Sequence, residues 1–306
     1  MGHNHHHGHG HDHHHDEAKS FNKAFIIAIV LTLGYTFAEA GYGIMAHSMS
    51  LLADAAHNLG DGLGLILAGL ANWLLSFPSR KRYSYGFKRT TIIAALINAF
   101  ILVATSALIA YESIYKIFHL TGVDESTVIA VGLIGILVNG GSSLLFRHGG
   151  DDLNIRGAFL HLLMDMLLLV GVVVSAIVIK YTGQVWIDPV IGLIIVAIVL
   201  WGTWGLLRNS LSLIMDAVPH YIDHAGVKQY LAQYPGVVAV HDLHIWGLST
   251  REVALTAHLV MPNTPLTDAD HKKIQAALQH DFQINHVTIQ VETGDMIDPC
   301  VRAGTC

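Results

Sequence analysis

Long apolar stretches alternate with short polar connections through the first two thirds of this chain. Each stretch has about 20 residues or more, which is enough to cross a hydrocarbon core of ~30 Å as an α-helix. The six stretches cover residues 23–46, 49–76, 90–117, 126–147, 154–180 and 188–207. The pattern predicts an α-helical membrane protein with six transmembrane helices.

The pattern changes after Arg208, where polar residues become frequent. Residues 221–234 and 267–282 have helical periodicity, whereas 237–247, 252–261 and 286–292 are typical of strands. This α-β-β-α-β order predicts a small cytoplasmic α+β domain. We therefore expect four regions: a His-rich cytoplasmic tail (1–20), a six-helix transmembrane domain (21–208), a soluble domain (209–296) and a C-terminal tail (297–306).

Composition supports a location in a lipid bilayer and argues against a nucleic-acid partner. Of the 306 residues, 52% are hydrophobic and 13% are charged, against about 25% charged residues in soluble domains. The net charge is −6, which argues against a nucleic-acid partner. Basic residues gather at 80–89 and 147–156, so the positive-inside rule places these loops and both termini in the cytoplasm.

Two H-x-x-x-D strings lie inside stretches that otherwise exclude charge: His57 to Asp61 and His161 to Asp165. Residues four apart share one face of a helix, so each string presents an imidazole nitrogen beside a carboxylate oxygen. Two such helices supply a tetrahedral ligand set suited to Zn²⁺, whereas Mg²⁺, Ca²⁺ and Mn²⁺ prefer oxygen alone. An Asp at mid-bilayer costs ~2.5–3.5 kcal/mol and usually marks an ion pathway. We predict that these four residues form a transport site for Zn²⁺.

Protons compete with Zn²⁺ for these ligands, because a ligand must be deprotonated to bind metal. Histidine titrates near pH 6.5, which favours exchange of Zn²⁺ for protons driven by the inward proton gradient. Asp54 shares the helix face of His57 and Asp61, and Glu39 lies in the first stretch. Two interpretations stay open for Asp54 and Glu39: a proton relay or supporting role beside the metal, or solvation in a cavity near the helix ends.

The soluble domain has a second candidate metal site. A hairpin centred between Ser249 and Thr250 places His241 opposite His258, within ~5 Å of it, and Glu292 on the last strand could complete the site. The alternative is that each histidine is an ordinary surface residue. His244 points away from His241 in a regular strand, so we assign it no metal.

Several of these motifs resemble those of the cation diffusion facilitator family. They are the run EAGYGIMAHSMSLLADAAHNLGD from Glu39 to Asp61, the string ending at Asp165, Asp188-Pro189, and VHDLHIW over 240–246. The resemblance covers nearly all of residues 21–292. It implies a ferredoxin-like cytoplasmic domain, a homodimer and proton-driven efflux of divalent metals. It also implies a zinc transport site, often accepting Cd²⁺, on the four residues of the two strings, and a regulatory metal at His241, His258 and Glu292.

The resemblance suggests further roles, each with an alternative. A charge interlock between subunits is one such role, matched by Asp216 and a basic residue, Arg89 or Lys88. The alternative is that these residues are ordinary surface charges. Gln290 stands where some relatives have histidine, which disfavours a binuclear metal cluster. Each tail has two interpretations. The N-terminal tail captures metal or is an expression tag, and the C-terminal tail captures metal or has no function. The candidate accessory ligands are His5, His6, His7, His13, His14, His15, Cys300 and Cys306.

Two other function classes fit less well. A membrane metallohydrolase needs an open coordination position and a positioned base, but the chain has no H-E-x-x-H and the two strings fill four positions, so we expect no enzyme. A membrane metal sensor would not need carboxylates at membrane depth. We expect a Zn²⁺ exporter of the bacterial cytoplasmic membrane, with Zn²⁺ also as regulatory ligand; efflux of Co²⁺ or Ni²⁺ is the alternative.

Overall fold

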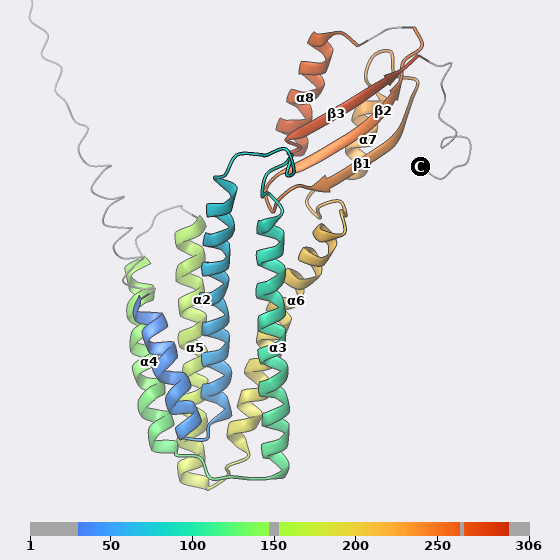
Figure 1. The fold of residues 1–306 in the computed structure, drawn as a ribbon. Coiled ribbons are helices and arrows are strands. Elements are labelled where there is room, and N and C mark those ends of the chain that lie inside the picture. The colour runs from blue at the N-terminus through green and yellow to red at the C-terminus, as the bar shows by residue number, and fades with distance from the viewer. Residues whose placement is uncertain (1–29, 147–152, 264–265, 294–306) are drawn as a thin grey trace, which may run out of the picture. The chain divides into compact units, whose positions relative to one another are not determined.

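The computed structural model describes residues 30–146, 153–263 and 266–293. Five of its helices are long and apolar enough to cross a membrane: α2 (Met49–Leu75), α3 (Thr90–Phe118), α4 (Glu125–Phe146), α5 (Leu153–Thr182) and α6 (Ile187–Ile214) (Figure 1). Residues 30–45 of the first predicted stretch are helical as well. The helical membrane architecture expected from the sequence is therefore confirmed.

Helix α6 continues to Ile214, seven residues beyond the last apolar stretch. Hydropathy falls at Arg208, but polar residues alone do not stop a helix. The helix ends where Asp216 adopts a left-handed φ of 58°. The N–H groups of Asp216 and Ala217 then donate to the carbonyl oxygens of Leu213 and Ser212, at 3.3 and 3.0 Å, which closes the helix as a Schellman motif.

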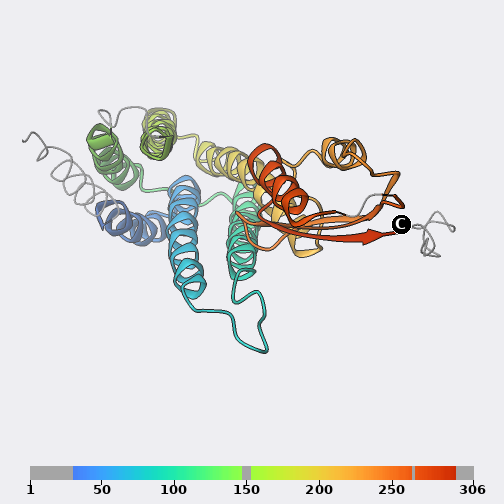
Figure 2. The ribbon, with the colours of Figure 1, turned by 90° about the horizontal axis from the view of Figure 1, so that it is seen from above.

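The chain divides into two compact units, of which the first holds the described residues up to Gly62 together with Leu102–Trp201. Within it α4 and α5 lie side by side (Figures 1 and 2). Its apolar core includes Leu51 of α2, Val128 of α4 and Leu169 of α5, each fully buried. These contacts hold α2 and α5, which carry the two H-x-x-x-D strings, in one packed body.

The first turn of α2 is capped by a residue of another helix. The carboxylate of Asp188, in the first turn of α6, accepts hydrogen bonds from Ser48 Oγ (2.6 Å), Met49 N (2.5 Å) and Ser50 Oγ (2.6 Å). A negative charge at this end also complements the dipole of α2. The N-terminal end of α2 is thereby fixed two turns before His57.

The second unit comprises Leu63–Ile101 and the chain from Gly202 onward. Its cytoplasmic part contains α7 (His224–Ala232), β1 (Ala239–Gly247), β2 (Val253–Val260), α8 (Asp268–Phe282) and β3 (His286–Glu292). The sheet order is β1-β2-β3, with β1 antiparallel and β3 parallel to the central β2. This confirms the predicted α-β-β-α-β domain.

Alternation along β2 decides which side chains meet the helices of this domain. Val253, Leu255 and Leu259 are fully buried in one core with Leu231 of α7 and Leu278 of α8, and both helices lie on the same side of the strands (Figure 2). Because successive side chains of a strand point to opposite faces, the even-numbered residues of β2, including His258, face away from this core.

Candidate metal centres

The two H-x-x-x-D strings meet within the first unit. Each lies within a single helix, α2 or α5, so both partners of a pair share a helix face. His57 Nε2 lies 3.7 Å from Asp61 Oδ2, and His161 Nε2 lies 3.6 Å from Asp165 Oδ2. We call His57, Asp61, His161 and Asp165 the membrane quartet.

Contacts between the two helices close the membrane quartet into a ring. His57 Nε2 lies 4.0 Å from Asp165 Oδ1, and His161 Nε2 lies 3.3 Å from Asp61 Oδ2. The two imidazole rings are nearly perpendicular, with centroids 6.2 Å apart. A tetrahedral zinc site with bonds of 2.0–2.2 Å has ligand atoms roughly 3.3–3.6 Å apart. The four contacts around the ring are near this spacing, but no three of these residues bring their ligand atoms within 4.8 Å of one another, so the side chains must move together to share one ion.

Exposure differs strongly within the membrane quartet. The Asp165 side chain is 2% exposed, whereas that of His161 is 49% exposed. His57 Nδ1 and Asp165 Oδ2 are buried and have no hydrogen-bond partner among the described residues. The cluster is thus open on the side of His161, and it contains polar atoms that the folded chain leaves free for a ligand.

Glu39 and Asp54, the two residues with open interpretations, are both fully buried. Tyr35 Oη donates to Glu39 Oε1 at 2.9 Å, and Asn58 Nδ2 donates to Asp54 Oδ2 at 3.2 Å. No hydrogen bond described in the structure joins either carboxyl group to the membrane quartet. Complete burial disagrees with the alternative that these groups are simply solvated.

The cytoplasmic domain brings His241, His258 and Glu292 together, and we call them the cytoplasmic trio. One candidate ligand atom from each residue lies within 4.8 Å of the others, and among the described residues they are the one group that meets this spacing. His241 Nε2 lies 2.9 Å from Glu292 Oε2, and His258 Nδ1 lies 2.9 Å from Glu292 Oε1. The side chains are 8, 18 and 6% exposed in the same order.

Sheet register explains this meeting. His241 pairs with His258 across β1 and β2, as the hairpin prediction required, and Glu292 pairs with Val260 across β2 and β3. Residues two apart on a strand share a face, so Glu292 stands diagonally next to the histidine pair. The two imidazole centroids are 5.1 Å apart.

Asp242 is a neighbour of the cytoplasmic trio that sequence reasoning missed. The register shifts between His241 and His244, and Asp242 within this bulge has a positive φ of 50°. Its Oδ2 lies 3.4 Å from His258 Nε2, and its Oδ1 lies 2.8 Å from His244 Nε2. A bulge re-aims side chains of its strand, so this carboxylate reaches a histidine that a regular strand would place out of range.

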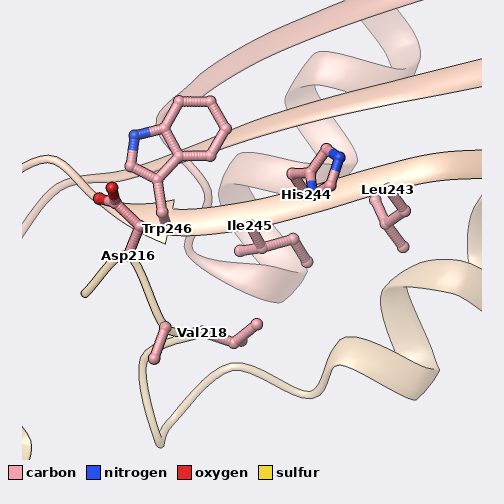
Figure 3. A pocket seen from close by; sticks show the side chains of 7 residues that line it. Asp216, Val218, Leu243, His244, Ile245 and Trp246 are labelled. Atoms are coloured by element: carbon pink, nitrogen blue, oxygen red, sulfur yellow. The ribbon is translucent and has the colours of Figure 1, made fainter. Parts of the chain in front are cut away.

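His244 lies apart from the cytoplasmic trio and lines a hollow of about 410 Å³ with Asp216, Val218, Leu243 and Trp246 (Figure 3). Asp216 is already paired with Arg89, at 2.5 Å between Oδ1 and Nη2. One imidazole and one paired carboxylate do not form a converging ligand set, so the hollow is not a metal site. Lys88, the other candidate for the charge interlock, pairs with Glu252.

The remaining predicted ligands lie outside the described residues. They are His5, His6, His7, His13, His14, His15, Cys300 and Cys306. Their accessory metal role stays a prediction.

The whole chain is similar to known cation efflux proteins. Residues 25–215 match the model of the cation efflux transmembrane domain, and residues 219–294 match that of the cation efflux protein cytoplasmic domain. A cadmium, cobalt and zinc/H⁺-K⁺ antiporter of Bacillus velezensis is 34% identical over 299 residues, covering 96% of this chain and 92% of the relative. The zinc transporter ZitB of Escherichia coli is 33% identical over 295 residues, covering 95 and 93%.

A solved structure, the metal-bound C-terminal domain of the CzcD transporter from Cupriavidus metallidurans, is 36% identical in sequence. It matches 23% of this chain and 99% of its own length, with a TM-score of 0.21. The two family models together span nearly all of the described residues, and both bacterial transporters align over almost their full length. This chain is an integral membrane protein that belongs to the cation diffusion facilitator family of cation efflux proteins.

Proposed function

We propose that this protein is a secondary active transporter that exports Zn²⁺ from the cytoplasm in exchange for protons. The observation that carries the proposal is the membrane quartet, in which two histidines and two aspartates from α2 and α5 approach within 3.3–4.0 Å. One relative is named a zinc transporter and another a cadmium, cobalt and zinc antiporter, and both names support the proposal.

Zn²⁺ is the favoured substrate because half of the membrane quartet is imidazole. Imidazole ligands suit zinc and its neighbours, and a mixed set of two nitrogens and two oxygens permits tetrahedral coordination. Cd²⁺ is a second candidate, and Co²⁺ or Ni²⁺ would use the same route. Intrinsic affinity rises from cobalt through nickel to copper, so enforced geometry must contribute to selection.

Proton exchange follows from competition at the same side chains. Zn²⁺ requires deprotonated histidines and carboxylates, so binding from the cytoplasm releases protons, and protonation on the other side favours release of the metal. The 49% exposure of His161 gives one ligand direct access to the surroundings of the cluster. The antiporter name of the Bacillus relative, which includes H⁺, agrees with this scheme.

The cytoplasmic trio is the proposed regulatory metal site. Its residue types fit Zn²⁺, since two imidazoles and one carboxylate leave a fourth position for water, while Asp242 faces the other ring nitrogen of His258. His241 Nδ1 is buried and has no hydrogen-bond partner among the described residues. We further propose a homodimer in which Asp216 and a basic residue, Arg89 in preference to Lys88, contribute a charge interlock, and tails that capture metal through histidine and cysteine.

We place the protein in a bacterial cytoplasmic membrane with both termini in the cytoplasm. The relatives cited here are bacterial, and the basic residues gather in two loops on the proposed cytoplasmic side. In this orientation the cytoplasmic trio faces the compartment from which metal is exported.

Zinc flux in proteoliposomes tests the proposal. Wild-type protein should accumulate Zn²⁺ in vesicles of inverted orientation, and an imposed pH gradient should accelerate the flux. His57→Ala should abolish it, whereas Ser175→Ala, which removes a hydroxyl bonded only to the carbonyl of Val172 in its own helix, should not. Flux that is indifferent to the pH gradient would contradict proton exchange, and flux retained by His57→Ala would exclude the membrane quartet as the transport site.

A further inference from the structure

Two carboxyl groups outside the membrane quartet face each other in the first unit. Glu39 comes from the helix over residues 30–45 and Asp54 from α2, and both are 0% exposed. Each has one oxygen that accepts a hydrogen bond, from Tyr35 Oη and from Asn58 Nδ2 respectively. The other oxygens, Glu39 Oε2 and Asp54 Oδ1, are buried and have no donor among the described residues.

The two carboxyl groups are close enough to hydrogen-bond to each other. An ionised carboxylate is only an acceptor, so a bond between two carboxyl groups requires that one of them carry a proton. Two buried carboxylates sharing a site cannot both ionise readily, because each disfavours the charge of the other. The orphaned oxygens and the mutual contact therefore indicate one shared proton.

The charged neighbours of this pair are few. Asp165 of α5 interacts electrostatically with both carboxyl groups, and Tyr35 is the titratable hydroxyl in direct contact. Helix α4 packs against Tyr35, whose Oη lies 3.4 Å from the carbonyl oxygen of Val131, and α4 carries no titratable side chain beyond Glu125 at its start. Helix α2 contains no lysine or arginine.

We propose that Glu39 and Asp54 form a proton-binding site, distinct from the metal ligands, which releases its proton when Zn²⁺ binds the membrane quartet. The inference rests on the proposed transport function. Burial and mutual repulsion favour a protonated pair before metal binds; the positive charge of Zn²⁺ at the membrane quartet favours loss of the proton. One Zn²⁺ enters and the shared proton leaves to solvent, and the reverse exchange restores the pair.

Counting protons released on zinc binding tests this inference. Full-length wild type, Glu39→Gln, Asp54→Asn and the control Ser175→Ala would be titrated with Zn²⁺ by calorimetry in buffers of different ionisation enthalpy. Both isosteric variants should bind Zn²⁺ within several-fold of wild type but release about one proton fewer per ion. Protons from the cytoplasmic trio are common to all four proteins and cancel. The control should release as many protons as wild type.

Infrared difference spectra distinguish proton binding by Glu39 and Asp54 from a purely structural role of these residues. Zinc binding to wild type should remove the carbonyl band of a protonated carboxylic acid, and that band should be absent in Glu39→Gln and Asp54→Asn; if one variant fails to fold, the other assigns the band. An unchanged proton count, or a band that survives zinc saturation, would overturn the inference. Failure of the proposed function looks different, since wild type would then not transport Zn²⁺ at all.

Discussion

The membrane quartet and the cytoplasmic trio use similar residue types but are built from different kinds of structure. The quartet takes two ligands from each of two helices, and each pair is fixed by a spacing of four residues within one element. The trio takes one ligand from each of three strands, and its ends are separated by 51 positions in sequence. A helical site thus needs one helix–helix contact, whereas a sheet site needs the correct register of every strand.

The two clusters also differ in how closely their ligand atoms lie. Separations in the quartet are 3.3–4.0 Å, whereas Glu292 lies 2.9 Å from both histidines of the trio. Hydrogen-bond distances within the trio mean that its groups satisfy one another, and metal must replace these contacts. The looser quartet has fewer such contacts, so metal binds there without first breaking them.

Asp165→Asn is expected to have the largest effect. Asp165 is the most buried member of the quartet, and substitution of a direct ligand should exceed the ~10–100-fold loss of affinity typical of groups that only support a ligand. Zinc flux in proteoliposomes should fall to background, while zinc binding at the cytoplasmic trio should persist in calorimetry of the same protein. Flux close to that of the Ser175→Ala control would show that the quartet is not the transport site.

His258→Ala tests the opposite case, because it removes the histidine on the central strand of the trio and leaves the quartet intact. We expect loss of the cytoplasmic zinc site in calorimetry, with affinity at least about 10-fold lower, and zinc flux reduced only a few-fold. His280→Ala is the matched control, since this histidine on α8 is 91% exposed and pairs only with its neighbour Asp281. Equal loss of flux in Asp165→Asn and His258→Ala would show that transport requires both sites to the same extent.

The difference in construction explains what the sequence could predict. The spacing from His57 to Asp61 and from His161 to Asp165 indicates shared helix faces without further information, and the apolar stretches locate the helices. The pairing of His241 with His258 was predicted as well, but the pairs nearer the turn, such as His244 with Thr256, lie one residue out of the predicted register, and the bulge brings His241 opposite His258. The two helical spacings depend only on elements that are regular in period.

Features that depend on irregular backbone or on distant contacts could not be predicted. Asp242 reaches His258 only because of the bulge, and α6 ends only where Asp216 adopts a left-handed conformation. The contact between Glu39 and Asp54 depends on how two helices rotate about their axes, which hydropathy does not specify. In each case the sequence offers the residue type but not its partner.

His57→Asp should change selectivity more than transport itself. A set with three carboxylates and one imidazole favours metals that prefer oxygen ligands, such as Mn²⁺. We expect the ratio of manganese to zinc flux to rise several-fold, measured by competition in proteoliposomes. The matching change in the trio, His241→Asp, should leave that ratio unaltered. A shift in both variants would mean that the cytoplasmic domain also selects the transported metal.

Asp242→Asn tests whether the bulge contributes to the trio. The carboxylate lies 3.4 Å from His258 Nε2, so the neutral amide should weaken zinc binding in the cytoplasmic domain by a few-fold through loss of a charged neighbour or ligand. Calorimetry in the Asp165→Asn background isolates this site. Affinity equal to that of the background protein would restrict the site to His241, His258 and Glu292.

The smallest expected effect separates the fold of the cytoplasmic domain from its metal site. Hydrogen bonds from Thr267, and then from Tyr234, lower the pKa of the Asp270 carboxyl group in the capping box of α8. A lowered pKa stabilises the folded state above the unfolded pKa of about 3.9, and this contribution is lost as pH falls through the folded pKa. Hydrogen exchange of α8 in full-length protein should therefore be faster in Asp270→Asn than in wild type at neutral pH, and the difference should shrink below about pH 4. Zinc affinity of the trio should be unchanged at neutral pH, because Asp270 lies outside it; a difference in exchange that does not depend on pH would assign the effect to packing instead of charge.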